Sequence, residues 1–216
     1  MPAGFRLDGR CALVTGASRG LGQAMAVALA EAGADVAGVA TGDLDETKAR
    51  VEATGRRFTA IVQDLRGSEA ARGAVEKAAG VMQRLDILVN NAGIIRRADS
   101  IDFTEAEWDD VVDLNLKSVF FLAQAAGRRF LAQRSGGKIV NIASMLSFQG
   151  GIRVPSYTAS KSGVLGLTRL LANEWAGKGI NVNAIAPGYM ATANTAPLRF
   201  RSTVDTCSGP RGDWSR

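Results

Sequence analysis

Short apolar runs alternate along the chain with longer segments in which apolar residues recur at helical spacing. The apolar runs predict six β-strands, at residues 11–14, 36–40, 58–63, 87–90, 138–142 and 181–185. The periodic segments predict helices at residues 21–32, 44–54, 68–83, 104–134 and 157–177, the fourth with a bend near Asn115. Strands that alternate with helices in this way favour a parallel sheet with helices on both faces, so we expect a single doubly wound α/β domain.

This pattern stops near residue 197. Residues 198–216 contain Gly, Ser, Arg, Asp and Pro with a few scattered larger apolar residues, and they show neither a helical nor a strand period. We therefore expect residues 1–197 to form the domain and residues 198–216 to be an aberrant, poorly ordered tail.

The composition is that of an ordinary globular protein, with 46% hydrophobic and 22% charged residues among 216. The net charge of +5 invites a nucleic-acid interpretation. From residue 199 onward, however, four Arg stand against two Asp, so +2 of this charge belongs to the tail. Elsewhere basic residues are dispersed and do not alternate with aromatic residues, so we expect no nucleic-acid partner.

Histidine is absent from the sequence, which excludes a His-based catalytic triad and removes the usual ligands of zinc, so no metal site is expected. The two cysteines, Cys11 and Cys207, lie at opposite ends of the chain, so we expect no disulfide and an intracellular, cytoplasmic protein. The longest uncharged stretch, residues 179–198, is interrupted by three Asn and two Pro. Neither a secretion signal nor a membrane span is indicated.

Candidate chemistry lies between Ser144 and Lys161. Tyr157 and Lys161 are four residues apart at the start of a predicted helix and share one of its faces. An ammonium group beside a phenol favours the ionised form, so we expect Lys161 to lower the pKa of Tyr157 and make it an acid/base. Ser144 ends a strand, and the loop that follows is short enough to bring its hydroxyl to the same substrate oxygen.

A glycine-rich turn joins the first predicted strand to the first predicted helix, and its spacing is G-x-x-x-G-x-G. Such glycines let the backbone approach a pyrophosphate, which is attracted by the free N–H groups and the positive end of the helix dipole. Tight-turn geometry alone is the alternative interpretation. As a nucleotide site of a Rossmann-like sheet, the turn supplies the candidates Thr15, Gly16, Ser18, Arg19, Gly20, Leu21 and Gly22.

Two more strands end at the same edge of the predicted sheet, where ligands of such sheets bind. Asn91, Ala92 and Gly93 follow the fourth strand, and their small size would let the backbone approach an adenosine. Asp64 and Leu65 follow the third strand, and the carboxylate could accept a hydrogen bond from an adenine amino group. An ordinary loop turn and a helix cap are the respective alternatives.

Together, the glycine turn, Asn-Asn-Ala-Gly at residues 90–93, Asn115, Ser144 and Tyr-x-x-x-Lys resemble the short-chain dehydrogenase/reductase family over about residues 5–197. Residues 93–99, 108–112, 141–157 and 186–192 are similar to a branch that acts on keto-deoxy sugar acids from uronate and pectin breakdown. The resemblance implies an NAD(P)-dependent oxidoreductase that interconverts a secondary alcohol and a ketone on a sugar acid of the 2-deoxy-D-gluconate or 2-dehydro-3-deoxy-D-gluconate type.

The resemblance also implies roles for the catalytic residues. Tyr157 exchanges a proton with the substrate oxygen while hydride moves to or from the nicotinamide, and Lys161 holds the nicotinamide ribose. Ser144 orients the carbonyl, and Asn115 anchors a water that passes protons to Lys161. For Asn115, a residue that merely kinks a helix is the alternative.

The substrate and the nicotinamide would be held by later segments. Pro187 and Gly188 resemble the start of the family's substrate loop, with Thr192 placed to contact the cofactor carboxamide. An acidic substrate needs a cation, for which Arg153 is the candidate, with Arg96 and Arg97 as weaker ones. The expected substrate-binding residues are Ser144, Gln149, Arg153 and Tyr157.

The choice of cofactor depends on the end of the second strand. The family usually signals NAD with an acidic residue there, whereas this sequence has Ala40 and Thr41, with Asp43 slightly late. Arg19 could instead meet a 2′-phosphate, so NADP stays open. The resemblance to the sugar-acid branch favours NAD, with Thr41 at the ribose.

The C-terminus departs from the family, whose members continue with a further helix and a seventh strand. Residues 199–216 resemble neither element, so we expect a truncated or frame-shifted product in which the sixth strand is an exposed edge. The resemblance implies a homo-tetramer, but part of a subunit interface would be formed by the helix and strand that residues 199–216 do not resemble. Another short-chain reductase, such as a 3-oxoacyl-carrier reductase, and an inactive dinucleotide-binding fragment are the alternative functions.

Overall fold

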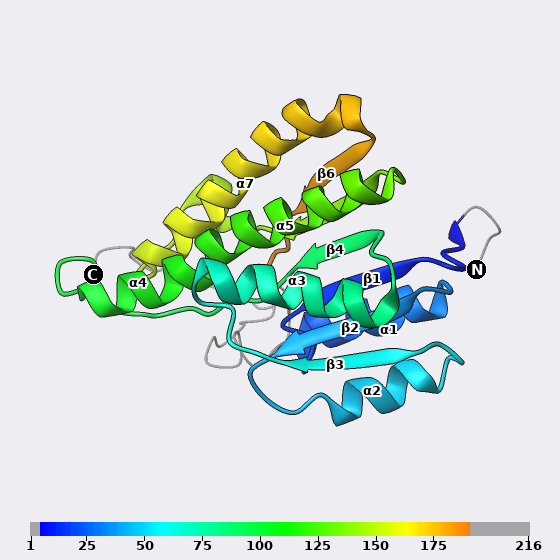
Figure 1. Cartoon of the computed structure of the whole chain (residues 1–216). Coiled ribbons are helices and arrows are strands. Elements are labelled where there is room, and N and C mark those ends of the chain that lie inside the picture. Colours follow the sequence, from blue (N-terminus) through cyan, green and yellow to red (C-terminus); the bar gives the residue numbers. More distant parts are fainter. Residues whose placement is uncertain (1–4, 191–216) are drawn as a thin grey trace, which may run out of the picture.

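The computed structural model describes residues 5–190, and within them six parallel strands form one sheet in the order β3-β2-β1-β4-β5-β6 (Figure 1). The strands are β1 (Cys11–Thr15), β2 (Asp35–Ala40), β3 (Phe58–Val62), β4 (Ile87–Asn90), β5 (Gly137–Ile142) and β6 (Ile180–Ile185). The order runs outward from β1 in both directions, which places a topological switch point between β1 and β4. This confirms the predicted doubly wound α/β fold. Thr192 and the expected tail from residue 198 lie outside the described residues.

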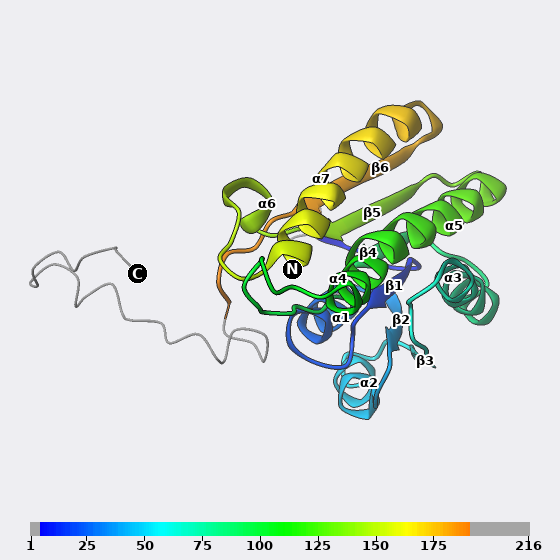
Figure 2. The same ribbon diagram turned by 90° about the vertical axis from the view of Figure 1, so that its left-hand side faces the viewer.

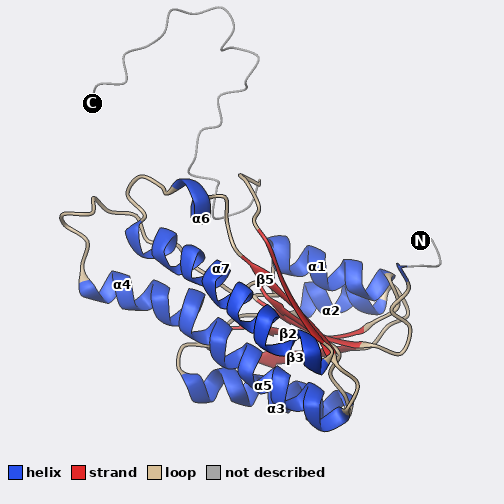
Figure 3. Cartoon of the chain, turned by 90° about the horizontal axis from the view of Figure 1, so that it is seen from above, coloured by secondary structure: helices blue, strands red, loops and turns tan. Residues whose placement is uncertain are grey.

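Helices cover both faces of the sheet (Figure 3). They are α1 (Gly20–Glu31), α2 (Asp45–Glu52), α3 (Ser68–Met82), α4 (Glu105–Val112), α5 (Ser118–Gln133), α6 (Leu146–Gln149) and α7 (Pro155–Trp175). Buried residues of α1 and α2 pack with one face, and those of α3, α5 and α7 pack with the other. All residues of β1 and β2 are buried, as a sheet covered on both sides requires.

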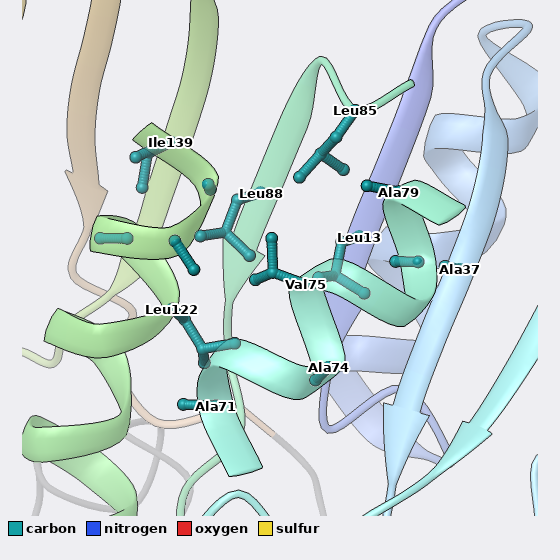
Figure 4. Close-up of a cluster of buried hydrophobic side chains, with 14 of the residues drawn as sticks. Leu13, Ala37, Ala71, Ala74, Val75, Ala79, Leu85, Leu88, Leu122 and Ile139 are labelled. Atoms are coloured by element: carbon teal, nitrogen blue, oxygen red, sulfur yellow. The ribbon is translucent and has the colours of Figure 1, made fainter. Parts of the chain in front are cut away.

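The larger core cluster lies under α3 and α5 (Figure 4). Leu13 of β1, Leu88 of β4 and Ile139 of β5 point from adjacent strands toward Val75 and Leu122, and all five are fully buried. Each such side chain contributes about 1.5–3 kcal/mol by leaving water. This packing fixes the strands whose carboxyl ends carry the candidate site.

The helix predicted over residues 104–134 is interrupted. Thr104 and Glu107 form the predicted capping box, after which α4 gives way to a π-helical turn, Asp113–Lys117, before α5 begins. Asn115 is completely buried inside this turn. The predicted bend near Asn115 is therefore this π-helical turn. Such turns are frequent at functional sites.

The amino edge of the sheet is held by Asp86. Its backbone N–H donates to the Cys11 carbonyl at 2.9 Å, and its carbonyl accepts from Lys138 N at 2.9 Å, which joins the starts of β1, β4 and β5. Its buried carboxylate accepts from Cys11 N (2.9 Å), Arg10 (3.0 Å) and Arg84 Nε (2.8 Å). Burial acts to raise the pKa of Asp86, but the hydrogen bonds from Arg84, Cys11 N and Arg10 together lower it.

We predict that Asp86→Asn destabilises the fold by about 1–3 kcal/mol, because a charged acceptor of several hydrogen bonds is lost. A carboxyl whose pKa is lower in the folded state stabilises the protein above the unfolded pKa and stops doing so as the pH falls through the folded pKa. The difference between wild type and variant in urea unfolding should therefore be full at pH 7 and shrink in acid. Asp102→Asn, in an exposed loop, is the control; equal stability losses for the two variants would contradict this account.

Candidate active site

The catalytic candidates meet at the carboxyl end of β5. Ser144 follows β5 by two residues, and the loop from there through α6 returns the chain to the first turn of α7 (Figure 2). Tyr157 and Lys161 lie on that first part of α7, with Lys161 only 5% exposed. The hydroxyl of Ser144 acts on the Tyr157 phenol through a side-chain hydrogen bond. The loop therefore folds back as expected, and the three side chains form one group.

The buried ammonium of Lys161 is held by the strand. Its Nζ donates a hydrogen bond of 2.5 Å to the carbonyl of Ile142, the last residue of β5, and lies 5.7 Å from the centre of the Tyr157 ring. Burial lowers the pKa of Lys161 to about 8. The ammonium thus lies over the phenol ring. Because its pKa is about 8, half of its charge is lost at about one pH unit above neutrality.

The pKa of Tyr157 differs from the prediction. Burial raises it, while the hydrogen bond from Ser144 and the positive charge of Arg97 act to lower it. The prediction that Lys161 lowers this pKa is wrong for the described structure, because Lys161 directs its hydrogen bond to Ile142 and the loss of water around the phenol outweighs the favourable groups. A neutral phenol beside Ser144 is a proton donor.

Asn115 connects the π turn to the other catalytic elements. Its Oδ1 accepts from Ile94 N at 2.9 Å, and its Nδ2 donates to the Ile94 carbonyl at 2.9 Å. Nδ2 also reaches Ser160 Oγ at 3.5 Å, and Ser160 in turn donates to the Tyr157 carbonyl at 2.9 Å. A Cβ on Gly93 would approach Asn115 Oδ1 to 3.1 Å, so this contact also favours glycine there.

Sequence reasoning missed some of these supports. Ser160 lies between Tyr157 and Lys161 in the sequence motif, but the sequence does not show that its hydroxyl accepts a hydrogen bond from the buried side chain of Asn115. Ser147 donates to the Lys161 carbonyl at 2.8 Å from α6. Because α6 has only four residues, it is too short to show a helical period, so the sequence did not predict this helix.

A cavity of about 250 Å³ opens at the switch point between β1 and β4. Eleven of the predicted cofactor residues line it: Gly16, Ser18, Arg19, Gly20, Leu21, Gly22, Thr41, Leu65, Asn91, Ala92 and Gly93. The walls also include Ala40, which the sequence analysis placed at the end of the second strand, and Val39, Gln63, Ile94 and Leu114, which were not predicted.

The glycine turn leaves the start of α1 open. Gly16 and Gly20 have φ values of 67° and 57°, which favour glycine, and Arg19 provides no side-chain cap for the helix. The first N–H groups of α1 therefore face a cavity with the positive end of the helix dipole, which suits an anion. Gly22 serves packing instead, because a Cβ there would lie 2.0 Å from the Gly16 carbonyl oxygen.

The other predicted cofactor residues do not line the cavity. Thr15 holds two residues of the cavity wall in place, since its Oγ1 accepts hydrogen bonds from Asn91 N and Ala92 N, each at 3.0 Å. The carboxylate of Asp64 accepts from Arg66 Nη1 at 2.8 Å and from Arg66 N at 3.0 Å. The carbonyl of Pro187 accepts from Met145 N at 3.0 Å, which brings the segment with Gly188 beside the loop after Ser144.

Among the described residues that line the cavity, Arg19 is a cation and none is a carboxylate, and Thr41, directly after β2, also lines it. Asp43 is engaged elsewhere, because its Oδ1 accepts from Asp45 N at 2.7 Å at the start of α2.

The predicted substrate arginines have different surroundings. Arg153, at a φ of 63°, pairs with Asp99 at 2.9 Å. Arg96 pairs with Asp110 of α4. Arg97 acts on the Tyr157 phenol through its charge. Gln149 is exposed at the end of α6.

Two structural tests concern other kinds of function. No helix within residues 5–190 has the length and apolar character needed to cross a membrane. In the same residues, no group of three or more His, Cys, Asp or Glu side chains is arranged to hold a metal ion.

Comparison with known proteins agrees with this geometry. A 2-dehydro-3-deoxy-D-gluconate 5-dehydrogenase from Dickeya dadantii (strain 3937) is 62% identical over 213 residues, which cover 97% of this chain and 84% of the relative. The enzyme of the same name from Escherichia coli (strain K12) is 59% identical with the same coverage. A solved structure from Agrobacterium tumefaciens with bound NADP, provisionally named 2-deoxy-D-gluconate 3-dehydrogenase, is 58% identical, covers 90% of this chain and 77% of that chain, and has a TM-score of 0.85.

The family model for short chain dehydrogenases matches residues 10–202. With the predicted motifs gathered at one edge of the sheet, the chain belongs to the short-chain dehydrogenase family.

Proposed function

We propose that this chain is a cytoplasmic NAD(P)-dependent dehydrogenase that interconverts a secondary alcohol and a ketone on a deoxy sugar acid of the 2-dehydro-3-deoxy-D-gluconate type. The observation that carries the proposal is the half-buried Tyr157 beside the buried Lys161, with Ser144 against the phenol, on a helix that Asn115 connects to the cavity wall at Ile94. Relatives 59% and 62% identical bear the name 2-dehydro-3-deoxy-D-gluconate 5-dehydrogenase.

The residues of the cavity fit a nicotinamide dinucleotide. The open first turn of α1 and residues 16–22 would hold the pyrophosphate, Thr41 and Arg19 the adenosine ribose, and Leu65 with Asn91 the adenosine. The bound nicotinamide accepts or supplies the hydride.

Within the chain, Tyr157 handles the proton. Its raised pKa keeps the phenol protonated at neutral pH, which suits donation to the oxygen of a ketone undergoing reduction. Ser144 would hydrogen-bond the same oxygen and orient it. Lys161 would bind the nicotinamide ribose, and Asn115, beside Ser160, would support a proton path toward it. In the oxidation direction it is the phenolate form of Tyr157 that accepts the proton of the substrate hydroxyl, which regenerates the phenol.

The carboxylate of the substrate requires a cation at the mouth of the site. Arg153 was the predicted residue, and it forms an exposed ion pair with Asp99. Arg97 has the advantage that its charge already acts on the Tyr157 phenol. We therefore propose that Arg97 contributes to binding the carboxylate together with Arg153.

The first prediction concerns Tyr157. Tyr157→Phe should lower kcat for oxidation of 2-dehydro-3-deoxy-D-gluconate by about 10²–10⁴, because the proton acceptor is removed. Binding of NADH, followed by its fluorescence, should change little. Ser162→Ala, an exposed position of α7, is the control. Wild-type activity in the Tyr157→Phe variant would contradict the mechanism, and faster turnover of a 3-oxoacyl thioester would contradict the substrate class.

The second prediction concerns the choice of cofactor. Arg19→Ala should lower kcat/KM with NADP about tenfold or more, because a charge-assisted contact with the 2′-phosphate is lost. The value with NAD should fall much less, so the ratio of the two cofactors reports the effect. An equal loss with both cofactors would mean that Arg19 does not read the 2′-phosphate.

The third prediction separates the rim arginines. Arg97→Met should raise KM for the sugar acid about tenfold, because its charge acts next to the reacting phenol, and Arg153→Met should raise the same KM by a smaller factor. The KM for the cofactor should be unaffected. A neutral analogue that lacks the carboxylate should lose these differences, and unchanged sugar-acid KM in both variants would exclude this pair.

A further inference from the structure

Two loops that form walls of the nucleotide cavity are tied to the same carboxylate. Arg66, in the loop after β3, pairs through Nη2 with Asp110 Oδ1 at 2.8 Å. Arg96, in the loop after β4, pairs with Asp110 Oδ2. The Asp110 side chain is 23% exposed and belongs to neither loop, because it projects from α4. One side chain thus joins three segments of the chain.

The connection continues toward the adenosine end of the cavity. Arg66 also pairs through Nη1 with Asp64 Oδ2 at 2.8 Å, and its backbone N–H donates to Asp64 Oδ1 at 3.0 Å. Charges of alternating sign therefore run through Asp64, Arg66, Asp110 and Arg96, which we call the Asp110 clamp. Gln63 and Leu65 of the cavity wall flank its first residue.

The other end of the clamp meets the opposite wall. Arg96 follows Ile94 by two residues, and Ile94 both lines the cavity and is held by Asn115 through two hydrogen bonds of 2.9 Å. α4 itself is a firm base, since the Thr104–Glu107 capping box fixes its start and the helix packs against α7. The clamp can therefore set how far the two loops stand apart.

The effect of removing the carboxylate follows from the charges. Exposed ion pairs usually contribute little, but here one partly buried carboxylate pairs with two guanidinium groups at once, and Asp64 supplies the second negative charge. Without it, Arg66 would keep its pair with Asp64, but the carboxylate that bridges Arg66 and Arg96 would be lost and only the repulsion between the two guanidinium groups would remain across the space between the loops. The expected consequence is a wider cavity and a freer Asp64–Leu65 wall.

We propose that Asp110 is a positioning residue for the nucleotide: it holds the loops after β3 and β4 at the separation that the adenosine half of the cofactor requires. This inference rests on the cofactor role proposed above. Asp110 acts through Arg66 and Arg96 and takes no part in hydride or proton transfer.

The test measures binding of NADH and of NADPH by fluorescence in the absence of sugar acid, together with steady-state kinetics. Asp110→Asn, which keeps the shape and removes the charge, should raise Kd and cofactor KM about three- to tenfold, with kcat at saturating cofactor within about twofold. Asp110→Glu should recover much of the affinity, because the carboxylate returns. Asp109→Asn, its exposed neighbour on α4, should bind as wild type does.

Arg66→Met removes the Arg66–Asp110 ion pair by changing the other partner, and it should weaken binding of NADH and NADPH in the same way. This variant tests the proposal if Asp110→Asn does not fold. Unchanged Kd in either folded variant, even with a lower Tm, would overturn the positioning role and leave the proposed function intact. A wild-type protein that binds neither NADH nor NADPH would instead overturn the proposed function, and this inference with it.

Discussion

The site depends on the burial of one ammonium group. Lys161 lies in the interior with its hydrogen bond to the last carbonyl of β5, and this contact connects the start of α7 to the sheet. A buried charge is tolerated only with such a partner. The same burial lowers the pKa of Lys161 to about 8 and contributes to an apolar setting in which the phenol of Tyr157 stays protonated. The packing that buries Lys161 and Tyr157 therefore also sets their protonation states.

The supporting structure transmits that constraint to the cofactor side. Asn115 in the π turn is hydrogen-bonded to Ile94 and lies within reach of Ser160, so the wall of the nucleotide cavity and the catalytic helix share one buried amide. Asp110 ties the same wall to the loop after β3 from outside. Buried polar networks of this kind specify one arrangement because each unsatisfied member would be costly.

The fold was largely predictable because its strands are buried on both faces and its helices carry regular periodicity. The capping box at Thr104 and the bend at Asn115 also left clear signals in the sequence. The short helix α6 left none, and the pKa of Tyr157 depends on burial and on Arg97, which no spacing rule contains. The ion pair that engages Arg153 depends equally on how two distant loops meet. The site roles of the motif residues remain predictions, whereas family membership is established.

The most direct test of the central claim follows one hydrogen atom. With 2-dehydro-3-deoxy-D-gluconate deuterated at C5 as substrate, wild-type protein should transfer the label to the nicotinamide of NAD or NADP, detected by mass spectrometry of the reduced cofactor. Lys161→Met should lose most of this transfer, because it removes the group that we propose orients the nicotinamide ribose beside Tyr157. Unlabelled reduced cofactor, or no reduction of either cofactor by the wild-type protein, would contradict hydride transfer at this site.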